Sequence, residues 1–484
     1  MLLSGLELTA KAALIIAGLT VAGVPIVAVC FRSRGTPSLV VYPLSGVALV
    51  TLSAWTWTEI SGRSARFVGP ILLLAGATTF AVRILRSGSP FGRPSARTVG
   101  LLLTVAVSTG LLLVHYEPVW SVGAHTQPQG GTADVAGYVM IADLLLEEGT
   151  SAEGSIAGYD LGSQARKDVF GAYAYLAFAS QVTPGAVWTS SLPALLAAFL
   201  LVAACTYEWL AAVFGRSYAL IALAVACAFG TYFVIYALQQ YFLSQFLAMS
   251  AVPMALLLLG FAHRASSRKD RAAVAASFGV VVVVATMAYP PVLFGALPVA
   301  VVVGTIAELV AGERGRRWRV SASALATVGA GALAGLVLCS SRTWLSLRRI
   351  AELEDANAGW PLPEITPVEL MGFQRTFHQD TPQAFVVWSV LVAAVLVAAV
   401  AIGLQRRASR QLLVPPIVAV GLYGSYLLVY EREGISYRQW KWLSYFAPLI
   451  VAGVVCTVAF VLAQSRLSSK RPRNLVLGTL LALL

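Results

Sequence analysis

The chain is built from apolar runs of about 20 residues that are separated by short polar segments. Each run is long enough to cross a hydrocarbon core of about 30 Å as an α-helix. The short segments of alternating polarity that are typical of a transmembrane β-barrel do not occur. The pattern therefore predicts an all-α polytopic membrane protein with about 13–14 transmembrane helices. The predicted spans cover residues 12–31, 37–57, 67–85, 98–115, 187–213, 217–237, 240–262, 272–288, 291–311, 320–340, 382–404, 411–430 and 442–464, and a fourteenth begins near Leu475.

The two ends of the sequence shape this prediction further. The first apolar run is long for a signal peptide and lacks a convincing cleavage site, so we interpret it as a retained helix. The last run covers only about half of a span before Leu484. We therefore expect residues 466–484 to be a basic cytoplasmic linker and the start of a further helix in a longer, truncated chain.

Composition agrees with the membrane interpretation. Hydrophobic residues make up 58% of the 484 residues and charged residues only 12%, which lies outside the range of soluble globular domains. The five cysteines fall inside apolar runs and lack metal-ligand spacing, so we expect small buried side chains and no metal site from them. They are Cys30, Cys205, Cys227, Cys339 and Cys456.

The distribution of Lys and Arg predicts which loops face the cytoplasm. One set of alternate loops holds 22 of the 34 basic residues and only 4 of the 22 acids. The positive-inside rule places that set in the cytoplasm, so the net charge of +12 reflects topology and requires no nucleic-acid partner. The larger polar loops, 116–186, 341–381 and 431–441, then lie outside. Because no phosphate-cradling Gly-rich motif is present, we expect the chemistry to be extracytoplasmic and not driven directly by ATP.

A carboxylate in the first outer loop is the main catalytic candidate. Residues 132–148 have the period of a helix that Thr132 can cap, and Tyr138, Ile141, Ala142 and Leu145 share its apolar face. Asp134 lies in line with that face, whereas Asp143 and Glu147 point away from it. Asp134 is therefore either a general base near apolar surroundings or simply a residue that supports the start of the helix.

The loop and the helices around it resemble a known enzyme family. Asp134-x-x-x-Tyr138, followed by "Ala-x-x-Leu" and "Glu-Gly", looks like the first extracytoplasmic loop of the GT-C glycosyltransferases, which use polyprenyl-phosphate sugars. The stretch from Tyr159 to Gly215 and the "AYPPV" hairpin at 288–292 are also similar. The resemblance covers residues 98–465, and the helices of residues 1–97 precede it as an N-terminal transmembrane part. It implies that Asp134, or as a second choice Asp143, deprotonates the acceptor hydroxyl.

Cationic and aromatic residues in the later outer loops are candidate substrate-binding groups. Arg438 and Lys441 lie three apart on one helical face and suit a lipid phosphate, although an aromatic belt with snorkelling cations would also place them there. Arg348 and Arg349 are positive charges on the outer side, where an amphipathic helix balanced by acids is the alternative. The full set of candidate substrate-binding residues is Tyr138, Arg348, Arg349, His378, Tyr437, Arg438 and Lys441.

Three further features have both a structural and a functional interpretation. Glu352, Glu354 and Asp355 offer oxygen ligands for a divalent cation, although no cofactor is required. "GALAG" at 331–335 is typical of close helix packing. Glu208 is an acid within a span, which suggests a functional site, and its closeness to Arg216 also permits an interfacial ion pair.

These features favour a membrane glycosyltransferase that moves a sugar from a polyprenyl-phosphate donor to an extracytoplasmic glycan or glycolipid acceptor. A transporter or lipid flippase and a non-catalytic assembly scaffold are the alternatives; no internal repeat of the transporter kind is visible. The Ala-, Val- and Arg-rich composition is typical of a GC-rich bacterial genome. We therefore expect a bacterial plasma membrane protein that acts on the cell envelope.

Overall fold

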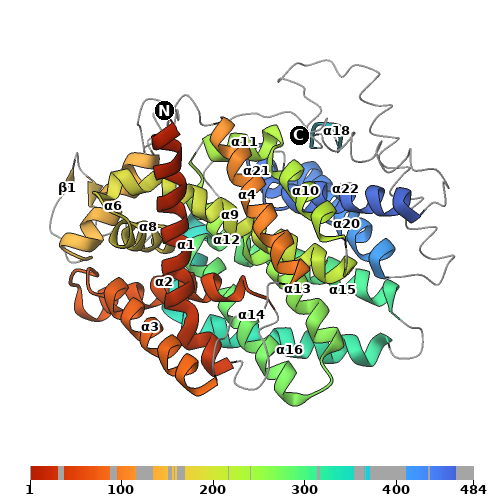
Figure 1. The fold of residues 1–484 in the computed structure, drawn as a ribbon, viewed down its shortest axis with the longest axis horizontal. Helices are drawn as coiled ribbons and strands as arrows, with labels where there is room; N and C mark the ends of the chain where they lie inside the picture. The colour runs from red at the N-terminus through yellow and green to blue at the C-terminus, as the bar shows by residue number, and fades with distance from the viewer. Residues whose placement is uncertain are drawn as a thin grey trace.

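The structure is a computed structural model, shown in Figure 1. It describes residues 2–30, 38–87, 95–115, 134–150, 155–156, 159–160, 169–215, 217–239, 241–312, 317–353, 365, 367–370, 410–433 and 436–464.

Helices make up nearly all of the described chain, as the hydrophobic pattern predicts. One short hairpin, β1 (Ser155–Ile156) paired antiparallel with β2 (Tyr159–Asp160), is an addition to the predicted all-α fold. The helices are α1 (Leu2–Cys30), α2 (Val41–Ser61), α3 (Val68–Ser87), α4 (Ala96–His115), α6 (Asp134–Glu147), α8 (Phe170–Val182), α9 (Val187–Phe214), α10 (Tyr218–Phe229), α11 (Tyr232–Gln239), α12 (Leu243–Met249), α13 (Ala251–Arg264), α14 (Arg268–Ala288), the π-helix η1 (Val292–Ala296), α15 (Leu297–Ala311), α16 (Arg317–Leu338), α17 (Ser340–Leu353), α18 (Pro367–Leu370), α20 (Arg410–Glu433), α21 (Ser436–Ser444) and α22 (Ala447–Gln464).

The described residues include eight helices that are long and apolar enough to cross a membrane, so the coarse prediction of a multi-pass helical membrane protein is confirmed. The predicted span 37–57 forms α2, but this helix is not among the eight because its Thr, Ser and Trp residues lower its hydropathy. The span 217–237 is divided between α10 and α11 at Gly230. The spans 382–404 and the one near Leu475 lie outside the described residues.

Turn residues explain where several helices end. Gly62 and Gly215 follow α2 and α9 with φ angles of 66° and 68°, the left-handed conformation that ends many helices and that glycine adopts without steric cost. The Pro290-Pro291 pair follows α14, because a proline cannot donate the backbone hydrogen bond that would continue it.

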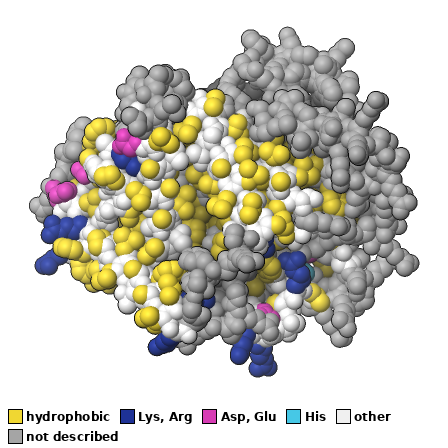
Figure 2. All heavy atoms as spheres, viewed as in Figure 1, with side chains coloured by type: hydrophobic (Ala, Val, Ile, Leu, Met, Phe, Trp, Pro, Cys, Tyr) yellow, Lys and Arg dark blue, Asp and Glu magenta, His cyan; other side chains and the backbone are white. Residues whose placement is uncertain are grey.

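Helix α9 is the centre of the bundle. It is buried along nearly its whole length and packs against α1, α4, α8, α10, α12 and α13. Its many alanines let neighbouring helices approach closely, which matters in lipid because packing replaces the hydrophobic effect between helices. Helix α3 lies at the periphery with mostly exposed apolar residues. Figure 2 shows hydrophobic side chains over most of the described surface in that view, with Lys and Arg at its lower and left edges.

Helices α14 and α16 pack backbone to backbone through glycines. A Cβ atom added at Gly331 would lie 2.2 Å from the carbonyl oxygen of Ala275, and one at Gly335 would lie 2.7 Å from that of Gly279. The contact therefore has room only for hydrogen at these two positions, and the predicted packing role of "GALAG" is confirmed.

Segments predicted to face the same side of the membrane contact one another. Trp55 Nε1 of α2 donates to Ser341 Oγ at the start of α17 over 3.1 Å; Trp55 lies near the predicted outer end of the span 37–57, and Ser341 begins the predicted outer loop 341–381. At the opposite end, His263 Nε2 lies 3.1 Å from Ser321 Oγ, and both are predicted to lie inside. The predicted alternation of sides is therefore compatible with the fold.

Substituting Gly331 tests the α14–α16 contact. We expect Gly331→Ala to lower the free energy of unfolding by about 1–3 kcal/mol, because the added methyl group collides with backbone that cannot move aside. Gly329→Ala on the same helix is the matched control, since a Cβ atom there meets nothing within 4 Å. Thermal unfolding of both variants in detergent measures the difference. Equal unfolding temperatures would contradict the packing argument.

Candidate functional site

A buried turn between α11 and α12 is the best candidate for a functional site. Tyr241 in this turn has a φ angle of 55° and is 1% exposed. Such a left-handed conformation is rare for a bulky residue, and sites that store backbone strain are often functional. The Tyr241 hydroxyl donates to the carbonyl oxygen of Ser191 on α9 over 3.1 Å, which holds the turn against the central helix.

Helix α6 packs onto one side of this turn. The Tyr138 hydroxyl donates to Ser244 Oγ over 2.8 Å, and the Tyr138 ring lies 5.3 Å from the ring of Tyr173 and 5.7 Å from that of Tyr241. These rings form one aromatic cluster, with the pair Tyr138–Tyr241 nearly perpendicular, a favourable arrangement. Helix α8, which carries Tyr173, is itself fixed to α9, because the Tyr175 hydroxyl donates to the Ala194 carbonyl oxygen over 2.9 Å. Burial raises the pKa of Tyr175, so this donor stays protonated.

The predicted faces of α6 are confirmed. Its apolar face is buried and its two acids on the other face are exposed. The described part of the helix, Asp134–Glu147, lies within the predicted range 132–148. Thr132 and the side chain of Asp134 lie outside the described part of the chain. The buried residues are Tyr138, Ile141, Ala142 and Leu145, and the exposed acids are Asp143 and Glu147.

Helix α21 packs onto the other side of the turn. Lys441 Nζ donates to the Tyr289 hydroxyl over 3.2 Å, and lies 5.0 Å from the centre of the Phe242 ring and 5.6 Å from that of Tyr289. A half-buried ammonium between two aromatic faces is stabilised by cation–π attraction. Lys441 is therefore a fixed positive charge, in contrast to a snorkelling lysine that extends freely into water.

A hydrogen bond joins α12 to α21 and continues into a second one within α21. Gln245 Nε2 donates to Ser444 Oγ over 2.6 Å, and the Ser444 hydroxyl donates to the carbonyl oxygen of Lys441 over 2.6 Å. Trp442 on the same helix donates to Ser425 Oγ of α20 over 3.1 Å. We call the residues around this turn the α12 cluster: Tyr138, Tyr241, Phe242, Ser244, Gln245, Tyr289, Lys441 and Ser444.

The structure brings only part of the predicted site together. Tyr138 and Lys441 meet in the α12 cluster, whereas Arg348 is exposed on α17 and Asp143 faces away on α6. Arg349, Tyr437 and Arg438 lie in helices, but their side chains are outside the described part of the chain, as is His378 altogether. No group of three His, Cys, Asp or Glu residues that could hold a metal ion occurs among the described residues. Glu354 and Asp355 fall outside them.

The residues that connect Tyr138 to Lys441 were not among the predicted site residues. Tyr241, Ser244, Gln245 and Ser444 are isolated polar residues at the ends of apolar runs, so they form no recognisable spacing. The stretch "LQQYFLSQF", residues 238–246, puts several polar residues at the boundary of two predicted spans, and this was the sequence feature that could have indicated a polar site. Arg342, which also lies in the predicted outer loop 341–381, is buried to 1% exposure with its guanidinium 5.4 Å from the Trp55 ring.

An apolar crevice lies beside α6, away from the α12 cluster. It lies between α2, α3, α6 and α8, and the polar side chain of Gln181 is at its wall. Its lining contains no charged residue, so it supplies no groups for acid–base chemistry.

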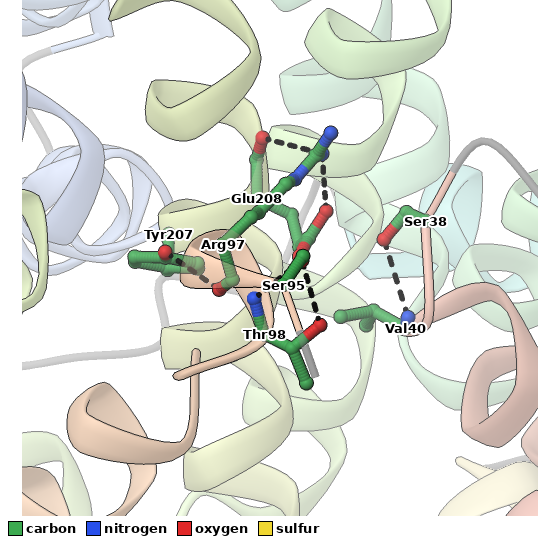
Figure 3. A network of polar contacts seen from close by, with 7 residues as sticks. All are labelled: Ser38, Val40, Ser95, Arg97, Thr98, Tyr207 and Glu208. Atoms are coloured by element: carbon green, nitrogen blue, oxygen red, sulfur yellow. Dashed lines mark hydrogen bonds and ion pairs between the residues drawn. The ribbon is translucent and has the colours of Figure 1, made fainter. Parts of the chain in front are cut away.

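A second polar cluster surrounds Glu208 at the opposite end of α9 (Figure 3). Glu208 is 2% exposed and pairs with Arg97 of α4, whose guanidinium also donates to the Glu208 carbonyl oxygen over 3.4 Å. The Tyr207 hydroxyl donates to the Arg97 carbonyl oxygen over 2.8 Å. The observed partner of Glu208 is thus Arg97, and Arg216 lies outside the described residues. Helix α4 begins at Ala96, so Arg97 is part of the first helix of the expected module 98–465, and the pair joins α4 to α9.

Comparison with known proteins adds no family to this picture. No family model matches the chain, and no curated protein matches it at the threshold of significance.

Breaking the Arg97–Glu208 pair tests its structural role. Only 3% of the Glu208 side chain is exposed, against 29% of the Arg97 side chain, so an unpaired Glu208 reaches water less easily. We expect Arg97→Met to cost about 3–5 kcal/mol of stability and Glu208→Leu to cost less. The double variant, which leaves no buried charge, should be more stable than Arg97→Met alone. Unfolding midpoints of the three variants measure the order of their stabilities. A double variant whose loss of stability equals the sum of the two single losses would contradict the expected order.

Proposed function

We propose that the protein is a membrane glycosyltransferase that moves a sugar from a polyprenyl-phosphate donor to an extracytoplasmic acceptor of the cell envelope. The supporting observation is that α6, which begins with Asp134, and α21, which carries Lys441, both pack on the turn at residues 241–245. Sugar transfer from a lipid phosphate needs a base for the acceptor and a cation for the leaving group. The two helices supply one candidate for each role.

Asp134 is the proposed general base. It lies one helical turn before Tyr138, whose hydroxyl is bound to Ser244 in the α12 cluster. In the proposed reaction the Asp134 carboxylate takes the proton of the acceptor hydroxyl, and the acceptor oxygen forms a bond to the anomeric carbon. The bond from that carbon to the phosphate oxygen breaks, and the leaving polyprenyl phosphate keeps the electron pair.

Lys441 is the proposed cation for the leaving group. Its ammonium is fixed by Tyr289 and by the Phe242 ring, so it is oriented before any ligand binds. A preorganised positive charge stabilises negative charge that develops on a departing phosphate. Arg438 lies three residues earlier on the same helix, where its forked guanidinium would add a second phosphate contact.

A lipid flippase is the second candidate, and one observation favours it. The chain from α10 to α12 is interrupted twice, at Gly230 and at the strained Tyr241, and interrupted helices line the substrate sites of many transporters. The two functions differ in their products, since a flippase moves the lipid-linked sugar without cleaving it.

Substituting Asp134 tests the proposed base. In purified protein reconstituted in lipid, we expect wild type to release polyprenyl phosphate from at least one of a panel of lipid-linked sugars. We expect Asp134→Asn to bind that donor but to release polyprenyl phosphate about 10²–10⁴-fold more slowly, because general-base catalysis contributes a factor of that size. Asp143→Asn is the matched control on the same helix, because Asp143 is exposed on the opposite face.

Two outcomes would contradict this account in different ways. If Asp143→Asn slows release as much as Asp134→Asn does, the assignment of the base is wrong. If wild type moves lipid-linked sugars across the bilayer and cleaves none of them, the protein is a flippase.

A further inference from the structure

The side chain of Gln245 has a buried oxygen without a hydrogen-bond donor. Gln245 is 2% exposed, and its Oε1 atom accepts no hydrogen bond from the residues that the structure describes. The amide orientation follows from its neighbour. The Ser444 hydroxyl proton already goes to the Lys441 carbonyl oxygen, so Ser444 Oγ must accept from the amide nitrogen of Gln245, which leaves Oε1 free.

A buried acceptor of this kind is costly and uncommon. Leaving a polar group buried and unpaired costs about 1–3 kcal/mol. Native proteins pair nearly all such groups, so each exception needs an explanation such as a ligand or a water molecule. Gln245 Nε2 is fixed by Ser444 and also lies 3.8 Å from Met249 Sδ, so the carboxamide is held in one orientation.

The position of this oxygen indicates what kind of donor it meets. Phe242 and Gln245 are three residues apart at the start of α12, and Lys441 and Ser444 are three residues apart on α21. The Phe242 ring lies against Lys441, and Gln245 is bonded to Ser444. The backbone positions of Lys441 and Gln245 are therefore offset by about one helical turn along the α12–α21 contact, roughly 5 Å. A sugar ring separates its glycosidic oxygen from its distant hydroxyls by a similar length.

The charges nearby restrict the ligand further. A cationic group would be repelled by the positive charge of Lys441. An anionic group without a proton cannot donate a hydrogen bond to Gln245 Oε1. The group that fits is a neutral hydroxyl in a molecule whose anionic part lies near Lys441.

We propose that Gln245 determines donor specificity by accepting a hydrogen bond from a sugar hydroxyl while Lys441 contacts the phosphate of the same molecule. The inference rests on the proposed function, because it takes the ligand to be a lipid-linked sugar. Gln245 thereby distinguishes a carrier with a sugar from the bare carrier.

The test compares the binding of two probes to the full-length protein in nanodiscs: polyprenyl phosphate alone, and polyprenyl phosphate bearing a single hexose or pentose. We expect wild type to bind the sugar-bearing carrier more tightly than the bare carrier. In Gln245→Met the ratio of the two Kd values should fall about tenfold, because one neutral hydrogen bond of about 1.4 kcal/mol corresponds to a tenfold change in Kd. Lys441→Met should weaken the binding of both probes alike.

A control variant and a second test variant separate this role from a structural one. Ser425→Ala removes the hydrogen bond from Trp442 of α21 and leaves Gln245 and Lys441 in place, so it should retain the preference for the sugar-bearing carrier. Gln245→Leu also removes the acceptor oxygen and should lose the preference as Gln245→Met does, which provides a readout if Gln245→Met does not fold.

Three results would overturn the inference. If Gln245→Met keeps the full wild-type preference, the oxygen is paired only by water. If wild type binds both carriers equally, no sugar hydroxyl is recognised here, although the lipid-phosphate site of the proposed function would stand. If wild type binds neither carrier, the proposed function itself fails.

Discussion

Two adjacent side chains on α12, Ser244 and Gln245, hold the candidate site together. Ser244 accepts the hydroxyl of Tyr138 from α6, and Gln245 donates to Ser444 of α21. Both amphipathic helices are therefore attached by directed hydrogen bonds to one turn of a membrane helix. Hydrogen bonds between buried polar groups specify relative positions more narrowly than apolar contacts do. The separation between the proposed base, Asp134 on α6, and Lys441 on α21 depends on this attachment.

The helices beneath that turn are held by contacts of a different kind. Alanines of α9 and the glycines Gly331 and Gly335 allow close approach of backbones, and one buried ion pair fixes α4 to α9. Packing of this kind suits a lipid environment, where apolar surface gains little by leaving the solvent. The opposite ends of α9 thus carry distinct polar clusters. The Glu208 cluster joins helices, whereas the α12 cluster combines a fixed cation with an acceptor, Gln245 Oε1, that no described residue pairs.

The sequence predicted those features that follow from periodicity or composition. The buried face of α6, the eight described helices that are long and apolar enough to cross a membrane, and the glycine contact at 331–335 all express a local repeat, so a single sequence was enough to locate them. The partner of Glu208 was not predictable, because Arg97 lies 111 positions earlier in the sequence and reaches it only through helix packing. Gln245 and Ser444 were missed for the same reason, since neither has a motif and their meaning comes from facing each other. Asp134 and Arg438 stay predictions.

The proposed site for a lipid-linked phosphate is the α12–α21 contact. Photo-crosslinking tests it most directly, using a polyprenyl phosphate that carries a diazirine on its first isoprene unit, with labelled peptides identified by mass spectrometry. The account predicts labels within residues 241–249 and 436–446 that excess unlabelled polyprenyl phosphate removes. Competed labels that appear only around Arg97 and Glu208 would contradict it and place the ligand at the other end of the bundle.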